Sequence, residues 1–137
     1  MAVINELLRS EADGTISFGN YTLASKSKLD NFEHGGDLYK VKTFQEITKL
    51  ERNGMFVYES VPGTAVMNMK ATEAGVEFQV EGPEDAEITL GLQEATEYKI
   101  LIDNSNVGQM KTNLGGKLTL SVELNPGQTV AVQVAKL

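Results

Sequence analysis

The sequence contains no cysteine and no tryptophan, only one histidine and only three prolines. Without cysteine the chain forms neither disulfides nor thiolate metal sites, so its stability has to come from a packed core. A single imidazole limits any Ser-His-Asp or Cys-His catalytic arrangement to that one ring. The absence of disulfides from a chain of 137 residues favours the cytoplasm as its compartment.

Long hydrophobic runs are also missing, since no stretch approaches the about 18 apolar residues of a membrane span. The segment from Met1 to Arg9 lacks the basic region and apolar run of a signal peptide. Residues 63–137 carry five basic and ten acidic side chains and residues 1–62 carry seven and nine, which gives a net charge of -7. An acidic surface repels phosphate backbones and anionic lipids. We therefore expect a cytoplasmic protein that binds neither nucleic acid nor membranes.

Apolar and polar residues alternate through the second half of the chain, as in the segment Lys117–Leu124. Period-two alternation is typical of a strand with one face in a core and one in water. Turn residues such as Asn125-Pro126-Gly127 interrupt the alternation about every 8 to 12 residues, which predicts seven strands in a sandwich. The residues that this pattern places in the core are Val76, Phe78, Ile88, Leu90, Tyr98, Ile100, Leu118, Leu120, Val122, Val130 and Val132.

The first half is also β in character but less regular. Asp13-Gly14, Gly19-Asn20 and Asn53-Gly54 are dipeptides that fit two-residue hairpin loops. A two-residue loop at Asn53-Gly54 would place Leu50 opposite Val57. The sequence leaves open whether residues 3–9 form a short helix or a strand.

One polar stretch in the first half, residues 24–37, has only Leu29 and Phe32 as apolar anchors, and we expect a long loop there. The predicted fold class is therefore all-β. An antiparallel, immunoglobulin-like β-sandwich covers residues 63–137, and a smaller β-hairpin or meander unit covers residues 1–62. Val61-Pro62-Gly63 is the expected joint.

Candidate catalytic residues are few. The one histidine, His34, lies in the predicted loop, where we expect it to be solvated. Glu81, Glu84, Asp85 and Glu87 crowd a turn around Pro83, and carboxylates in a turn are expected to point to water. We predict no catalytic residue, no cofactor and no metal site, and therefore no enzyme.

The predicted hairpin around Asn53-Gly54 is apolar on both faces, because Met55 and Val57 alternate with Phe56 and Tyr58. One face has to meet the core. The other has to contact either the rest of the first half or another subunit. Met55, Phe56, Val57 and Tyr58 are therefore the candidate interface residues of a homo-oligomer.

Two resemblances extend this interpretation. Leu92, Thr96 and Tyr98 resemble the Leu-x-Pro-x-Thr-x-Tyr corner of fibronectin type III and related immunoglobulin-like domains, with Glu94 in place of the proline. The resemblance implies a sandwich in which the Tyr98 hydroxyl bonds to the backbone where the chain crosses between sheets. Four apparent strands follow Tyr98, where that fold would have two.

The whole chain, and Gly36–Phe44 and Asn53–Thr64 in particular, resembles a group of short uncharacterised bacterial proteins often labelled endosialidase. Sialidases are similar to one another in a large propeller fold with Ser-x-Asp-x-Gly-x-Thr-Trp boxes. The segment Ser10–Thr15 has a different spacing and no tryptophan, so no residue role carries over from the label.

The sequence thus supports two functional hypotheses. The first is a non-catalytic protein that self-associates in a structural or scaffolding role. The alternative is a carbohydrate- or ligand-binding module with a glycan or protein partner. For that module we expect Tyr21, Tyr39 or Tyr58 to stack on sugar rings.

Overall fold

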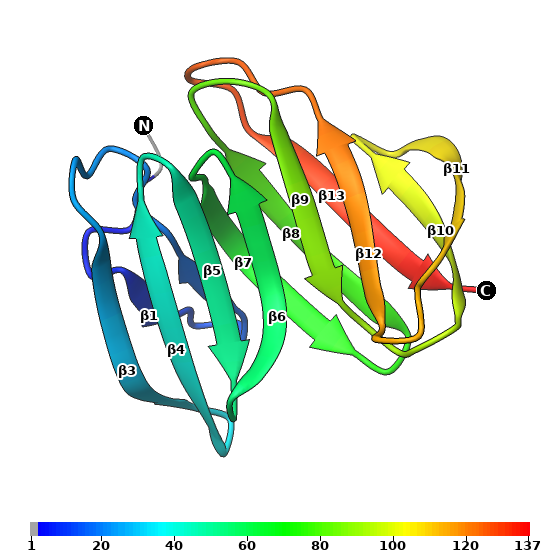
Figure 1. Cartoon of the computed structure of the whole chain (residues 1–137), viewed down its shortest axis with the longest axis horizontal. Helices are drawn as coiled ribbons and strands as arrows, with labels where there is room; N and C mark the ends of the chain where they lie inside the picture. Colours follow the sequence, from blue (N-terminus) through cyan, green and yellow to red (C-terminus); the bar gives the residue numbers. More distant parts are fainter. Residues whose placement is uncertain (1–2) are drawn as a thin grey trace.

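The computed structural model describes residues 3–137, which form thirteen strands and no helix. The strands build two antiparallel sheets that pack face to face as a sandwich (Figure 1), so the predicted fold class is confirmed. In chain order the strands are β1 (Leu8–Ser10), β2 (Ile16–Phe18), β3 (Ser27–His34), β4 (Asp37–Phe44), β5 (Ile47–Arg52), β6 (Met55–Val61), β7 (Ala65–Thr72), β8 (Gly75–Glu81), β9 (Ala86–Gly91), β10 (Glu97–Ile102), β11 (Ser105–Lys111), β12 (Lys117–Val122) and β13 (Val130–Lys136).

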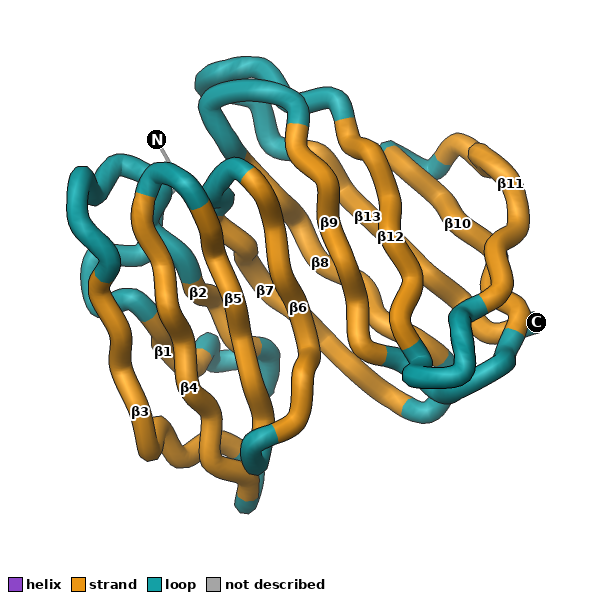
Figure 2. Tube along the Cα trace, in the orientation of Figure 1, coloured by secondary structure: helices purple, strands orange, loops and turns teal. Residues whose placement is uncertain are grey.

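The strand order is β1-β2-β7-β8-β13-β10-β11 in the seven-stranded sheet and β12-β9-β6-β5-β4-β3 in the six-stranded sheet. The predicted joint between residues 62 and 63 lies where the chain crosses from one sheet to the other. Because β2 pairs with β7 and β6 pairs with β9, each sheet contains strands from both sides of that joint (Figure 2). Residues 1–2 of the predicted N-terminal unit lie outside the described residues.

The core lies between the sheets and draws on both halves of the chain. Every core residue predicted from the alternating pattern is buried, from Val76 in β8 to Val132 in β13. Phe18, Val41 and Leu50 contribute from the first half and pack in the same cluster. Strands β7–β13 are the seven predicted strands, so the period-two pattern was sufficient wherever it is regular.

The predicted loop over residues 24–37 is wrong, because β3 and its turn occupy most of it. Leu29 and Phe32 are three residues apart, which breaks the period-two pattern. A β-bulge between them, with Asn31 at a φ of +55°, allows both side chains to pack against the core. Gly35-Gly36 then forms the two-residue loop to β4.

The hairpin at Asn53-Gly54 is confirmed, with φ of +52° and +79° at its two loop residues. Its predicted register is wrong, because Leu50 pairs with Tyr58. A bulge between Leu50 and the next pair along β5 leaves Val57 as the extra residue.

The other two dipeptides do not form two-residue hairpin loops. Five residues, 11–15, connect β1 to β2 around Asp13-Gly14. Gly19-Asn20 leads out of β2 into a longer connection, and the Gly19 N–H donates to the Leu7 carbonyl oxygen. Residues 3–9 form a turn followed by the start of β1, so the helical alternative is wrong.

Candidate functional site

The four candidate interface residues have very different surroundings. Tyr58 is fully buried, with 0% exposure, and its hydroxyl lies 2.7 Å from the Thr64 hydroxyl. Burial raises the pKa of Tyr58 above its ordinary value. Its ring makes edge-to-face contacts with Phe18 and Phe78. Tyr58 is therefore a core residue and takes no part in an outer surface.

The bulge at Val57 sets the directions of its neighbours. Val57 is half-buried and packs against the core, next to Tyr58. Phe56 faces away from the core, with the Lys117 and Lys49 ammonium nitrogens 4.6 and 5.9 Å from its ring centroid. Met55 is 72% exposed. The hairpin is thus apolar on both its inner face, with Val57 and Tyr58, and its outer side, with Met55 and Phe56. The inserted residue at the bulge breaks the strict alternation from which this was predicted.

The β5–β6 and β7–β8 hairpins lie at the same end of the sandwich (Figure 1). A groove opens beside them, lined by residues of both hairpins. It has a volume of about 530 Å³, within the usual range of about 300 to 1,000 Å³ for ligand sites. We call it the end groove, and its large aliphatic and aromatic side chains include Met55, Phe56, Val57, Val76, Leu90 and Leu92. Three of the four candidate interface residues therefore line one cavity.

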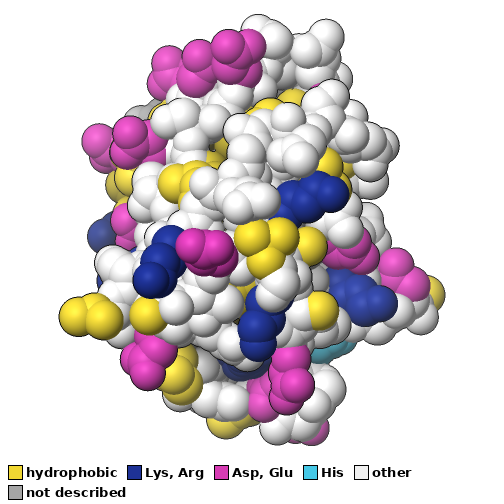
Figure 3. All heavy atoms as spheres, turned by 90° about the vertical axis from the view of Figure 1, so that its right-hand side faces the viewer, with side chains coloured by type: hydrophobic (Ala, Val, Ile, Leu, Met, Phe, Trp, Pro, Cys, Tyr) yellow, Lys and Arg dark blue, Asp and Glu magenta, His cyan; other side chains and the backbone are white. Residues whose placement is uncertain are grey.

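Charge is distributed unevenly between the two ends of the molecule. Arg52, Glu73 and Lys117 line the end groove, so basic and acidic groups are mixed there. At the opposite end, acidic side chains gather over the β8–β9 and β12–β13 loops, which contain Glu84 and Glu123 (Figure 3). The end groove is thus separated from the acidic end by the length of the sandwich.

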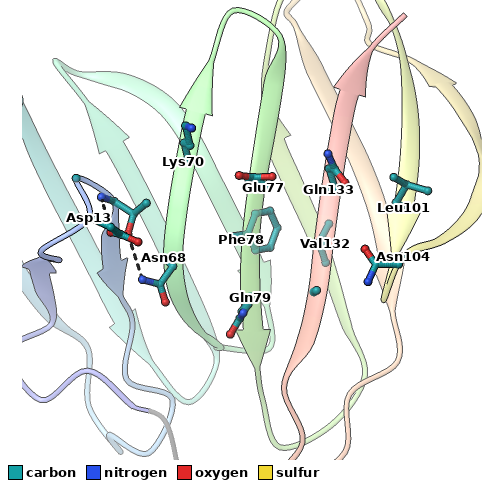
Figure 4. Close-up of a pocket in the computed structure, with 13 residues that line it drawn as sticks. Asp13, Asn68, Lys70, Glu77, Phe78, Gln79, Leu101, Asn104, Val132 and Gln133 are labelled. Atoms are coloured by element: carbon teal, nitrogen blue, oxygen red, sulfur yellow. Dashed lines mark hydrogen bonds between the residues drawn. The ribbon is translucent and has the colours of Figure 1, made fainter.

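A second groove, of about 540 Å³, crosses the outer face of the seven-stranded sheet (Figure 4). Strands β7, β8 and β13 form its floor, with the β1–β2 loop at one side and the β10–β11 turn at the other. We call it the polar groove, and its polar side chains include Asn68, Lys70, Glu77, Gln79, Asn104 and Gln133. These amides and charges suit hydrogen bonding to a polar ligand. Phe78 also lines the groove (Figure 4), although its side chain is buried.

His34 lies at the end of β3, where it is half-buried and its ring contacts two other segments. Its Nδ1 is 2.8 Å from the Ser10 hydroxyl and its Nε2 is 3.0 Å from the Gly14 carbonyl oxygen. Because a carbonyl oxygen only accepts, Nε2 carries a hydrogen and donates it to Gly14; in the tautomer with its single hydrogen on Nε2, Nδ1 accepts from the Ser10 hydroxyl. The ring thereby ties β3 to β1 and to the β1–β2 loop.

The acidic residues around Pro83 do not converge on a common point. Glu81 is buried, whereas Asp85 accepts a hydrogen bond of 3.0 Å from the Leu124 N–H. Glu84 and Glu87 are exposed. Across residues 3–137 no group of three or more His, Asp or Glu side chains is placed to hold a metal ion. In the same part of the chain no helix could cross a membrane.

The glycan-stacking surface predicted from tyrosines is wrong. Tyr21, Tyr39 and Tyr58 are all buried, as is Tyr98. The aromatic ring that faces outward from the middle of a sheet is Phe56, and Phe44 at the end of β4 is also only half-buried. Tyr39, Tyr58 and Tyr98 pack inward because each falls in phase with buried residues of its own strand, a signal that composition alone does not carry.

Compared with known protein families, with curated proteins and with solved structures, the chain gives no match, so the endosialidase label receives no support from any relative.

Proposed function

We propose that this protein acts in the cytoplasm by self-association, as a structural or scaffolding component rather than a catalyst. The end groove would be the contact between two copies. The observation that carries the proposal is Met55, which is 72% exposed beside an apolar cavity. Exposed apolar area is unfavourable by about 25 cal/mol per Å², so covering this end with a second copy stabilises the protein.

A two-fold dimer presents the same surface on both partners, so a projecting group and the cavity that receives it have to lie side by side. Met55 and the end groove have this relationship. The methionine side chain is unbranched and adapts to irregular cavities. Each copy could therefore insert Met55 into the end groove of the other.

Charge supports the same arrangement. The rim of the end groove offers Arg52 and Lys117 as cations and Glu73 as an anion, so opposite charges could pair across a two-fold axis. The acidic loops with Glu84 and Glu123 would point away from the contact. A net charge of -7 then does not oppose dimer formation strongly.

Light scattering coupled to size exclusion, at micromolar concentration, tests the proposal. The wild type should have twice the chain mass of 14.9 kDa. Met55→Asp should run as a monomer with an unchanged circular dichroism spectrum, because the side chain is exposed and its replacement does not disturb the core. Met55→Leu, which keeps an apolar group, should remain dimeric.

Val61→Asp is the matched control. Val61 is 52% exposed and lies on the same strand as Met55, at the other end of the molecule. This variant should stay dimeric. A monomeric wild type would end the proposal, and equal dissociation of the Met55 and Val61 variants would show that the contact lies elsewhere.

A further inference from the structure

Three lysines stand directly opposite one another on neighbouring strands of the six-stranded sheet. Lys28 in β3 pairs with Lys42 in β4, which pairs in turn with Lys49 in β5. The adjacent residues Val41 and Leu50 are buried, so Lys42 and Lys49 point to the outer face. We call Lys28, Lys42 and Lys49 the lysine row. The strands that carry neighbouring members are about 4.8 Å apart.

Like charges in directly opposite positions of a sheet are unfavourable. Lys49 has a carboxylate neighbour in Glu51, 3.8 Å away, and Glu59 stands opposite it on β6. Within residues 3–137, no carboxylate lies within ion-pair distance of Lys28 or Lys42. The repulsion along the lysine row is therefore relieved only in part by the protein itself, and an anionic ligand would relieve the rest.

Aromatic rings flank the lysine row on both sides. Phe44 lies two residues from Lys42 on the same face of β4, with the Lys26 ammonium nitrogen 5.8 Å from its ring centroid. Phe56 lies on the other side, 5.9 Å from the Lys49 nitrogen. The faces of such rings carry negative electrostatic potential and attract the polarised C–H groups of sugars.

We infer that the outer face around the lysine row binds an acidic polysaccharide. Carboxylates on successive sugar units would pair with Lys28, Lys42 and Lys49, while the sugar rings pack against Phe44 and Phe56. This site is separate from the polar groove on the other sheet. It shares Phe56 with the end groove, whereas Phe44 and the lysine row lie outside that groove.

A nucleic acid fits the same face less well. Arginine is the side chain that matches phosphate with two parallel hydrogen bonds, and Arg9 and Arg52 lie away from the lysine row. Lysine ammonium groups act as point charges, which suit single carboxylates, so a carboxylated glycan is the better match.

Calorimetric titration of the Met55→Asp variant with an oligogalacturonate tests the inference apart from any dimer formation. We expect binding that weakens as salt is added, because exposed charges are screened. The same oligomer with its carboxylates methyl-esterified keeps the sugar rings and loses the charge, and it should not bind measurably.

Lys42→Gln should weaken oligogalacturonate binding about tenfold, the loss expected when one charged hydrogen bond is removed. The same change should leave the melting temperature unchanged or raise it, because it removes a like charge from the lysine row. Phe44→Leu should weaken binding several-fold. Lys99→Gln on the seven-stranded sheet and Gln133→Ala in the polar groove should leave the affinity unchanged.

Three results would overturn the inference. They are no binding of the acidic oligomer, equal binding of its methyl ester, and an affinity that Lys42→Gln does not change. A single-stranded DNA oligomer that binds more tightly than the oligogalacturonate would assign the lysine row to nucleic acid instead, and would overturn it equally.

Discussion

The hydroxyl group of Thr48 exchanges two hydrogen bonds with the backbone of Thr64, donating to its carbonyl oxygen at 2.8 Å and accepting from its N–H at 3.1 Å. Because the single hydrogen of Thr48 is used in this way, the Thr43 hydroxyl donates to Thr48 at 2.9 Å. Thr43 accepts in turn from the Asn20 N–H. All four residues are buried, and together they tie the six-stranded sheet to the connection that enters the seven-stranded sheet.

Thr48→Val should lower the free energy of unfolding by about 2 to 4 kcal/mol, because it leaves both backbone groups of Thr64 buried without their partner. Urea denaturation followed by circular dichroism measures the loss. Thr48→Ser keeps the hydroxyl and should cost about 1 kcal/mol, for the lost methyl group. Equal losses in the two variants would mean that packing, and not hydrogen bonding, makes Thr48 important.

Tyr98→Phe tests the corner implied by the resemblance to fibronectin type III domains. The Tyr98 hydroxyl accepts a hydrogen bond of 3.2 Å from the Gln93 N–H, as that resemblance implies. Removing the hydroxyl should lower stability by about 1 kcal/mol, the usual net value of one hydrogen bond. The measurement is the urea midpoint, and a midpoint equal to that of the wild type would show that water satisfies the Gln93 N–H equally well.

His34→Ala should loosen the β1–β2 loop without unfolding the sandwich. It removes the contacts of the ring with the Ser10 hydroxyl and the Gly14 carbonyl oxygen. Hydrogen–deuterium exchange should become faster in residues 11–15 and stay unchanged in the central strands β8 and β13. Glu33→Ala, at the exposed neighbouring position, should leave the exchange of the loop as it is; faster exchange in both variants would contradict a specific role for the ring.

The hydrogen bonds that Glu11 accepts predict that the protein loses stability in acid. Hydrogen bonds from the Ser17 hydroxyl and then from the Arg9 guanidinium hold the pKa of Glu11 below its ordinary value of 4.5. A carboxyl group with a lowered pKa in the folded state contributes stability above its unfolded pKa and loses it as the pH falls through the folded pKa. The Glu11 contribution should therefore be complete at neutral pH and disappear below pH 4.5.

Urea midpoints measured at neutral pH and in acid should differ less in Glu11→Gln than in the wild type. Glu84→Gln, in the exposed β8–β9 loop, is the control for the change in net charge alone. If both variants respond to acid in the same way, the bonds from Ser17 and Arg9 do not account for the acid sensitivity.

The sequence predicted the second half well because alternate side chains of a strand point to opposite faces of the sheet. Where apolar residues alternate regularly, they are therefore the ones that become buried. Two failures in the first half share one physical cause, an inserted residue that changes the phase of a strand. Leu29 and Phe32 look like isolated anchors of a loop until the bulge at Asn31 brings them to one face. Because of the bulge at Val57, alternation alone likewise does not predict which side chains of the β5–β6 hairpin are buried.

The candidate site was harder to predict than the fold. The sequence correctly singled out Met55 and Phe56 as apolar groups in need of an explanation, but it grouped them with Tyr58, which the bulge turns into the core. The lysine row could not be found from the sequence pattern, because Lys28, Lys42 and Lys49 lie on three different strands and only the pairing of those strands sets them opposite one another. Only the register of three strands brings them together.

The connection between β6 and β7 also controls how copies could exchange strands. If residues 62–64 opened, β2 and β6 would lose their partners β7 and β9, and each half of the chain would expose two unpaired edges. In a second opened copy each edge would find the strand it pairs with here, so two opened copies could satisfy all of the edges by trading halves. Such an intertwined pair would contain the same two sheets and the same lysine row as a closed copy, and it would dissociate only when its β2–β7 and β6–β9 pairings are broken.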